Sequence, residues 1–278
     1  MTEPSPPIER ILIARDEEDL RNQASLDVLQ QALGRYSIEE VDDIAQADAM
    51  VALGGDGAFL HAARRYDYAP VPMTGINAGT LGYYMSTPPD PASIDYMVRN
   101  LATGDYHIHN LPLLELKRLG GELVRLAAND IVIRADGFQA FKAGLVISGT
   151  QFEHFTGSEL VFSTPQGSSG ESLAYGGPFL REGLPIWSVV PGAGHHSKDF
   201  YSLISSMVLG AEDDVVVEVK EANRRPFAIG TDGAKVTDWS QQEAAFRVAM
   251  SQEKSIQRIR LNNNSYLQDV SRIFRGRR

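Results

Sequence analysis

The sequence predicts an α/β N-terminal domain followed by an all-β, sandwich-like C-terminal domain. Strand and helix signals alternate over the first hundred residues, and short strands separated by turns follow residue 105. A length of 278 residues is large for one hydrophobic core and favours two domains. We therefore expect domains at 1–105 and 106–261, with residues 262–278 forming a helix that packs back on the first domain.

The first domain alternates apolar strands with amphipathic helices. Leu26, Leu29 and Leu33 recur at the spacing of one helix face. Gly34 follows them, where a C-cap glycine belongs. The predicted elements are strands at 11–14, 47–53 and 71–77 and helices at 19–34 and 58–66. Strands that alternate with helices in this way indicate a parallel sheet.

The second domain consists of short strands. In residues 214–220, Val215, Val217 and Val219 face one way and the intervening residues face the other, which is the period of a strand with one half-polar face. So many short strands indicate a sandwich or folded-over sheet. The predicted strands are 111–118, 122–128, 130–135, 143–148, 160–164, 186–190, 214–220, 244–250 and 255–261.

The composition excludes several classes of protein. A formal net charge of −10 disfavours non-specific binding of nucleic acid or of an anionic membrane. No apolar run approaches the roughly 20 residues that span a bilayer, and the polar start lacks the apolar core of a signal peptide. The absence of cysteine excludes disulfides and thiolate metal sites. We expect a cytoplasmic protein.

A glycine-rich turn between a buried strand and a helix is the first candidate for chemistry. In VALGGDGAFLHAARRY, Gly54, Gly55 and Gly57 surround Asp56. Glycines let a backbone approach phosphate closely, and the helix N-terminus favours an anion. An aspartate there can accept a proton from an attacking hydroxyl or hold Mg²⁺ against the phosphates. The alternative is an ordinary Gly-Asp-Gly turn. The sequence contains neither a Walker A motif nor G-x-G-x-x-G after a strand.

Two further clusters combine glycines with polar side chains. In TGINAGTLGYY (74–84), Asn77 can hydrogen-bond a ligand, or it can belong to a plain strand-to-loop connection. In STPQGSSGESLAYGGP (163–178), the hydroxyls of Thr164, Ser168 and Ser169 can surround a sugar or phosphate, or the stretch can be a long surface loop.

These clusters, in this order and spacing, resemble the NAD kinase family. The match covers GGDG with LHAAR, GINAGTLGY, AANDIVI at 127–133, the cluster at 163–178, and the late Asp-Gly in TDG at 231–233. It runs from about residue 50 to 235. GGDG alone is a weak signal, because lipid kinases of the same superfamily share it. Its combination with STPxGSS and GGP is specific.

The resemblance implies an active site between an α/β and a β-sandwich-like domain. It implies transfer of a phosphoryl group from ATP or polyphosphate, with Mg²⁺, to the 2′-hydroxyl of the adenosine ribose of NAD. It also implies a homodimer or homotetramer. Asp56 would be the catalytic base. The residues that would bind substrates are Gly54, Gly55, Gly57, Asn77, Asn129, Asp130, Ser158, Thr164, Ser168, Ser169, Glu171 and Asp232.

The chain departs from the family pattern around the dinucleotide. Asp130 replaces a glutamate, Ser158 replaces an aspartate unless Glu159 takes over its task, and Glu171 replaces a tyrosine. These changes touch acceptor specificity, and they leave open a non-catalytic nucleotide sensor as an alternative to a kinase. A lipid or small-alcohol kinase with the same loop is a second alternative, although it needs an apolar acceptor groove. The choice of donor, NAD against NADH, and the oligomer size stay open.

Four other residues have two interpretations each. Arg64 and Arg65 either reach the donor phosphates or are solvated cations at a helix end. His195 and His196 suggest a metal, but no third ligand stands at a known spacing, so a surface loop is favoured.

Overall fold

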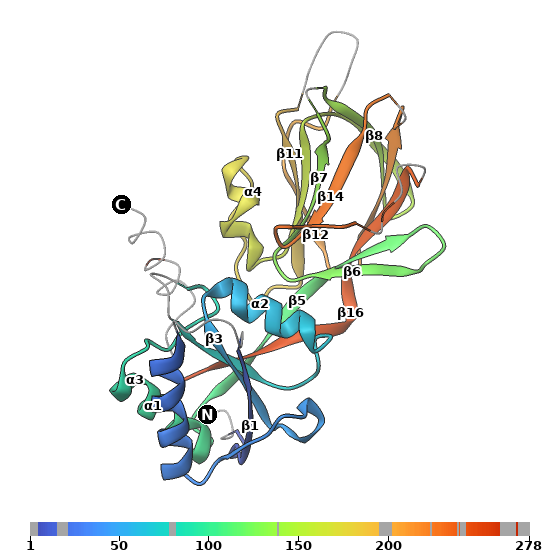
Figure 1. Cartoon of the computed structure of the whole chain (residues 1–278). Coiled ribbons are helices and arrows are strands. Elements are labelled where there is room, and N and C mark those ends of the chain that lie inside the picture. The colour runs from blue at the N-terminus through green and yellow to red at the C-terminus, as the bar shows by residue number, and fades with distance from the viewer. Residues whose placement is uncertain are drawn as a thin grey trace. The chain divides into compact units, whose positions relative to one another are not determined.

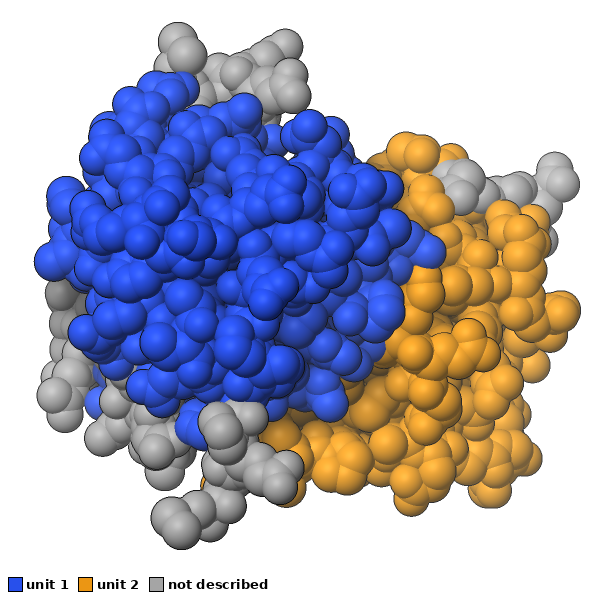
Figure 2. Space-filling view, turned by 90° about the horizontal axis from the view of Figure 1, so that it is seen from below, with its two compact units in different colours: residues 1–110, 255–278 blue, residues 111–254 orange. Residues whose placement is uncertain are grey.

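The computed structural model divides into two compact units, shown in Figure 1 and coloured separately in Figure 2. Unit 1 comprises residues 1–110 and 255–278, and unit 2 comprises residues 111–254. The sequence predicts the domain boundaries after residues 105 and 261, within a few residues of those of the two units. Residues 255–260 belong to unit 1 because the end of their strand pairs with a strand of that unit, Arg258 opposite Met73. The structure describes residues 5–15, 22–77, 82–137, 139–194, 202–222, 224–237, 239, 243–261 and 271.

Unit 1 is built on a parallel sheet. Its strands are β1 (Arg10–Ala14), β2 (Glu39–Glu40), β3 (Ala49–Gly54), β4 (Met73–Asn77) and the end of β16 (Ala245–Arg260). They lie in the order β2-β1-β3-β4-β16, and every pair is parallel. The carboxyl ends of β3 and β4 therefore meet at one edge, where Gly54 stands opposite Asn77.

Helices cover both faces of this sheet (Figure 1). Buried residues of α1 (Gln23–Arg35) and α3 (Pro91–Thr103) form one core with alternate residues of β3, such as Val51 and Leu53. The intervening Met50 and Ala52 face the other way, because side chains alternate along a strand. There α2 (Asp56–Arg65) packs on β3 and β4. A 3₁₀ turn, η2 (Ile44–Gln46), precedes β3.

The end of α1 and the helix α3 differ from the sequence predictions, and the short elements β2 and η2 were not predicted either. The C-cap prediction for Gly34 is wrong: α1 continues to Arg35, and Ser37, with φ of +57°, makes the left-handed turn instead. The helix α3 was not predicted. Its signals were present, since the Asp90 side chain accepts a hydrogen bond from the Ser93 amide at 3.0 Å and Gly104 ends the helix with φ of +74°.

Unit 2 is a β-sandwich. One antiparallel sheet has the order β12-β11-β10-β7-β14-β15, and β13 pairs antiparallel with β8 and β16 in the other, where β9 follows β8. Side chains of both sheets, including Phe162, Trp187 and Phe246, form a single core. The strands are β5 (His107–Arg118), β6 (Leu123–Ala127), β7 (Asp130–Ala135), β8 (Phe141–Ile147), β9 (Thr150–Gly157), β10 (Glu159–Ser163), β11 (Ile186–Gly192), β12 (Met207–Gly210), β13 (Asp214–Lys220), β14 (Phe227–Thr231) and β15 (Ala234–Lys235).

Most of these strands lie where the sequence predicts them. In β13, Val215, Val217 and Val219 are buried and the residues between them are not, so the period-two interpretation is confirmed. The strands predicted at 244–250 and 255–261 are one continuous strand, β16. Strands β9, β12, β14 and β15 were not predicted. The helix predicted for 262–278 lies outside the described residues, apart from residue 271.

Candidate active site

The glycine loop sits at the carboxyl edge of the unit 1 sheet. Gly54 ends β3, Gly55 is the N-cap of α2, and Asp56 is the first residue of that helix. Ligands of open α/β sheets bind at this edge. Gly54 adopts φ of +139°, and a Cβ there would lie 2.8 Å from the Cβ of Ala58, so the turn requires glycine.

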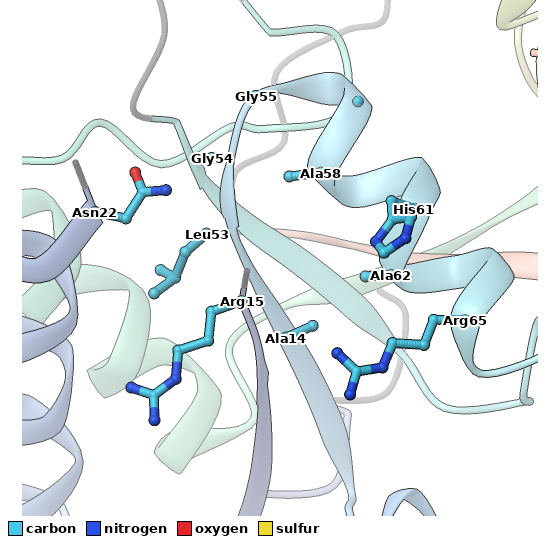
Figure 3. A pocket seen from close by; sticks show the side chains of 11 residues that line it. Ala14, Arg15, Asn22, Leu53, Gly54, Gly55, Ala58, His61, Ala62 and Arg65 are labelled. Carbon is cyan, nitrogen blue, oxygen red and sulfur yellow. The ribbon is translucent and has the colours of Figure 1, made fainter. Parts of the chain in front are cut away.

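A pocket of about 440 Å³ opens on one side of this loop (Figure 3). Its walls are the carboxyl ends of β1 and β3, Asn22 at the start of α1, and one face of α2. Gly55 and Gly57 also line it, and a Cβ on either residue would meet no atom within 4 Å. These two glycines therefore keep the backbone open to a ligand rather than relieving a clash.

The described side chains that line this pocket are cationic or neutral. Ala58, His61, Ala62 and Arg65 recur at the spacing of one helix face, and Arg15 joins them from the end of β1 (Figure 3). Among the described residues that line it, none is an aspartate or glutamate. Together with the N-terminal N–H groups of α2, this arrangement suits a polyphosphate.

Asp56 does not line that pocket; its carboxylate is held by backbone amides. The N–H of Tyr83 donates to Oδ2 at 2.7 Å, and those of Tyr84 and Met85 donate to Oδ1 at 2.9 and 3.4 Å. A carboxylate has about four acceptor sites. Three amides leave room for one more donor or for a metal ion, which matches either task expected of this residue.

The described residues that line a second pocket, of about 520 Å³, all belong to unit 2. Its floor comes from two paired antiparallel strands: Val132 and Arg134 of β7 stand opposite Gly230 and Ala228 of β14. The alternate residues Ile131, Ile133 and Ile229 point into the core. The rim is polar and consists of Asn129, Asp130, Glu171, Asp232 and Lys235.

Asp232 organises one end of this pocket. It has φ of +48°, and its carboxylate accepts the N–H groups of Ala128 at 3.0 Å, Asn129 at 2.6 Å and Asp130 at 3.3 Å. The neighbouring carboxyl of Asp130 is only 8% exposed. Burial, together with the charges of Asp232 and Glu171, raises the pKa of Asp130 to about 7. Asp130 therefore exchanges its proton near neutral pH.

Arg134 organises the other end. Its guanidinium forms an ion pair with Glu159 and a second one with Glu171, at 3.2 Å. Glu159 is 6% exposed and acts on the neighbouring Tyr175. Burial and this acidic partner raise the pKa of Tyr175 to about 12. The side chain of Ser158 is exposed, and its backbone carbonyl accepts a hydrogen bond from the N–H of Ala135, at the end of β7 that is far from Asn129. The carboxylate on this side of the pocket is that of Glu159, which pairs with Arg134.

The cluster at 163–178 uses its hydroxyls internally. Thr164 and Ser168 are fully buried; Thr164 donates to the Ala128 carbonyl at 2.6 Å, and Ser168 donates to the Pro165 carbonyl at 2.7 Å. A Cβ on Gly167 would overlap the Asn129 carbonyl oxygen. This segment, which includes η3 (Gly167–Ser169) and α4 (Glu171–Ala174), is packed directly against the Asn129 backbone.

The structure gathers the predicted residues at two places. Gly54, Gly55, Asp56, Gly57 and Asn77 meet at the edge of the unit 1 sheet, and Asn129, Asp130, Glu171 and Asp232 line the unit 2 pocket. Ser158, Thr164, Ser168 and Ser169 do not line that pocket. His195 and His196 lie outside the described residues.

Several residues that line the two pockets were not predicted from the sequence: Arg15, Asn22, His61, Arg134 and Lys235. A usable signal existed for His61, which stands four residues before Arg65 and therefore shares its helix face. The other four carry no local pattern, since their role depends on which strands become neighbours.

A parallel α/β unit with a phosphate-type glycine loop, joined to a β-sandwich with a polar pocket, defines a two-domain nucleotide phosphotransferase. Comparison with known proteins makes the class specific. Residues 15–106 match the family model of the ATP-NAD kinase N-terminal domain. An NAD kinase of Finegoldia magna is 30% identical over 189 residues, covering 66% of this chain and 68% of that protein. NAD kinase 1 of Listeria monocytogenes serovar 1/2a is 28% identical over 222 residues, covering 78% and 81%.

Solved structures support the fold. Yeast NADH kinase complexed with NADH superposes with a TM-score of 0.81 at 15% identity, over 97% of this chain and 88% of that one. An NAD kinase from Archaeoglobus fulgidus in complex with ATP gives 0.72 at 17% identity, over 96% and 97%. The predicted fold class is confirmed. The chain belongs to the NAD kinase family, whose members are phosphotransferases.

Proposed function

We propose that this member of the family transfers the γ-phosphoryl group of ATP to the 2′-hydroxyl of the adenosine ribose of NAD. The observation that carries the proposal is the geometry around Asp56. Its carboxylate is fixed by three amides at the start of α2, directly after the glycine loop, and keeps one acceptor site. Phosphoryl transfer depends on positioning and on charge stabilisation, so a fixed carboxylate beside an anion cradle is the machinery it needs.

In this reaction the ribose hydroxyl gives its proton to the open acceptor site of Asp56. The ribose oxygen forms a bond to the γ-phosphorus. The bond between that phosphorus and the β–γ bridging oxygen breaks, and ADP leaves. The cationic pocket of unit 1 binds the donor, since Arg15, His61 and Arg65 line it. Inorganic polyphosphate has the same repeating charge and is a second candidate donor.

The residues present also fit Mg²⁺. Among the described residues no group of three or more His, Cys, Asp or Glu side chains could hold a metal ion. Mg²⁺ does not need such a cage, because it binds through one or two carboxylates together with substrate phosphates and waters. In the alternative role of Asp56, its one open acceptor site would hold this ion instead of accepting the ribose proton. When bound, the ion neutralises charge on the transferring phosphoryl group.

NAD is the proposed occupant of the unit 2 pocket. Asn129, Asp130 and Asp232 supply polar groups at one end, and Val132, Ala228 and Gly230 form an apolar part of the floor, beside Arg134, on which a ring can pack. Thr164 supports the site by fixing the backbone of Ala128 and Asn129, whereas Ser168 bonds Pro165 and Leu180, and Ser169 belongs to the same segment. Glu171, paired with Arg134, stands where the family pattern carries a tyrosine, so this end of the pocket sets the acceptor preference of the chain.

The cellular setting belongs to the same proposal. Within the part of the chain that the structure describes, no helix is long and apolar enough to cross a bilayer. We propose a cytoplasmic enzyme that acts on NAD and a phosphoryl donor, not on nucleic acid or at a membrane, and that assembles as a homodimer or homotetramer. Light scattering during gel filtration measures the assembly; a monomer at micromolar concentration contradicts that part.

A coupled assay for NADP tests the function. The purified protein is supplied with NAD and Mg²⁺ and either ATP or polyphosphate. We expect NADP to form, and Asp56→Asn to lower the rate about 10³-fold, within the range for loss of a general base. Asp105→Asn, the same chemical change at an exposed position after α3, controls for general disturbance. Thermal stabilisation by NAD and ATP without turnover would identify a nucleotide sensor instead.

A further inference from the structure

A buried cation stands behind the glycine-loop site of unit 1. Arg258, in the final part of β16, is only 2% exposed and pairs with Met73 of β4. Placing a guanidinium in a protein interior is costly unless hydrogen bonds and charge partners compensate. A parallel sheet needs no arginine at such a position. The role of this side chain therefore lies in the groups that its guanidinium contacts.

Arg258 is directed at one residue of the Asp56 cradle. Its Nη2 donates to the carbonyl oxygen of Tyr83 at 2.6 Å, and its guanidinium carbon lies 5.4 Å from the centre of the Tyr83 ring. The hydrogen bond is charge-assisted, and the ring contact adds a cation–π attraction. Tyr83 is thus held through both its backbone and its side chain.

The same peptide group connects Arg258 to Asp56. The carbonyl of Tyr83 and the N–H of Tyr84 belong to one peptide unit, and in a planar trans peptide they point in opposite directions. Arg258 donates to the carbonyl on one side, and the Tyr84 N–H donates to Asp56 Oδ1 at 2.9 Å on the other. Fixing the carbonyl fixes the plane in which that N–H lies. Polarisation along the chain also strengthens the second hydrogen bond.

A second contact holds this peptide from the side of α2. The Tyr84 ring stacks on Phe59, with ring centres 5.0 Å apart and planes inclined by 12°. Phe59 is one turn after Asp56 on the same helix. The helix that carries the carboxylate is therefore packed against the residue whose amide binds it, and Arg258 sets the orientation of that amide.

We propose that Arg258 is a positioning residue for phosphoryl transfer, acting on Asp56 through the Tyr83–Tyr84 peptide. The inference rests on the proposed role of Asp56. A small misplacement of a reacting group can cost about 100-fold in rate. We therefore expect Arg258→Met to lower kcat about 100-fold, with unchanged KM for NAD and ATP, and Arg258→Lys, which keeps the charge and one donor, to recover part of the loss.

The control is a matched arginine–tyrosine contact elsewhere in the unit. The guanidinium of Arg99, on α3, lies 5.2 Å from the ring centre of Tyr96, and both residues are exposed. Arg99→Met should leave kcat unchanged. A second measurement is amide hydrogen exchange, read by mass spectrometry on peptides that cover residues 83–85. It should accelerate in Arg258→Met and Arg258→Lys and stay at the wild-type rate in Arg99→Met.

The double variant separates positioning from general support. If Arg258 acts through Asp56, Asp56→Asn with Arg258→Lys has the same residual rate as Asp56→Asn alone. Independent, multiplicative losses overturn the inference, as does unchanged exchange at 83–85 in both Arg258 variants. If Arg258→Met does not fold, Arg258→Lys alone decides by both readouts. A wild type that makes no NADP refutes the proposed function, whereas the exchange result still decides whether Arg258 orders the cradle.

Discussion

The glycine loop of unit 1 and the segment 163–178 of unit 2 look alike in sequence but work differently. In the first, Gly55 and Gly57 face open space, and the lining side chains point into a pocket. In the second, Gly167 touches backbone, and Thr164 and Ser168 bond within the protein. One cluster exposes its backbone to a ligand, and the other shapes the wall behind a pocket. Substitutions in the two clusters should therefore affect different quantities.

The largest expected effect is that of Gly167→Ala. The added methyl group would overlap the Asn129 carbonyl oxygen, so the segment or the Asn129 turn has to move. We expect a loss of at least about 3 kcal/mol of stability, measured as a fall in the denaturation midpoint. Gly57→Ala is the control from the other cluster, because no atom lies within 4 Å of its Cβ. Equal midpoints for the two variants would remove the distinction between the clusters.

The next effect concerns the pH dependence of stability at Asp130. Its pKa is about 7 in the folded protein against an ordinary 3.8. Between these values the folded state keeps a proton that the unfolded state has lost. The free energy of unfolding therefore falls as the pH rises from about 4 to about 7, and then stays at the lower level. Asp130→Asn removes this dependence.

The gain from Asp130→Asn should consequently grow by about 2–3 kcal/mol between pH 5 and pH 8. Thermal unfolding of wild type and variant at both pH values measures it. Asp136→Asn, at an exposed position after β7, should show the same difference from wild type at both pH values. A constant offset for Asp130→Asn would mean that this carboxyl is ionised throughout.

A smaller loss is expected for Thr164→Val, which keeps the shape and removes the hydroxyl. That hydroxyl donates to the Ala128 carbonyl and accepts the Gly167 N–H at 3.1 Å. A buried N–H left without its acceptor costs about 1–2 kcal/mol. Ser169→Ala, in the same segment but half-buried, should unfold like the wild type. If Thr164→Val keeps its stability and instead weakens NAD binding, the hydroxyl serves the ligand.

The sequence predicts elements whose signal is local. The strand β13 follows from the alternation of Val215 to Val219, and the loop–helix junction at Asp56 follows from glycines after an apolar run. The error at Gly34 shows the limit of such rules, because Ser37 took the left-handed conformation that glycine usually supplies.

Contacts between residues that are far apart in the sequence cannot be predicted from local sequence patterns. Gly54 and Asn77 meet only because β3 and β4 are adjacent and in that register. Arg134 finds Glu159 through the pairing of β7 with β10. The role of Arg258 depends on a strand that begins in unit 2 and ends beside β4. A single buried arginine produces no periodic pattern in the sequence, so only the structure shows that Arg258 is buried beside this site.

The smallest structural effect, and the clearest functional one, is expected at Arg65. It lines the cationic pocket, whereas its neighbour Arg64 does not, since successive residues of a helix point about 100° apart. Arg65→Gln should raise KM for ATP about tenfold, the loss of about one charge-assisted contact, and leave thermal stability and KM for NAD unchanged. Arg64→Gln should match the wild type. Because the lost contact is electrostatic, the difference between Arg65→Gln and wild type should shrink as salt is raised. A rise in KM for NAD instead would place the acceptor in this pocket and invert the assignment of the two regions.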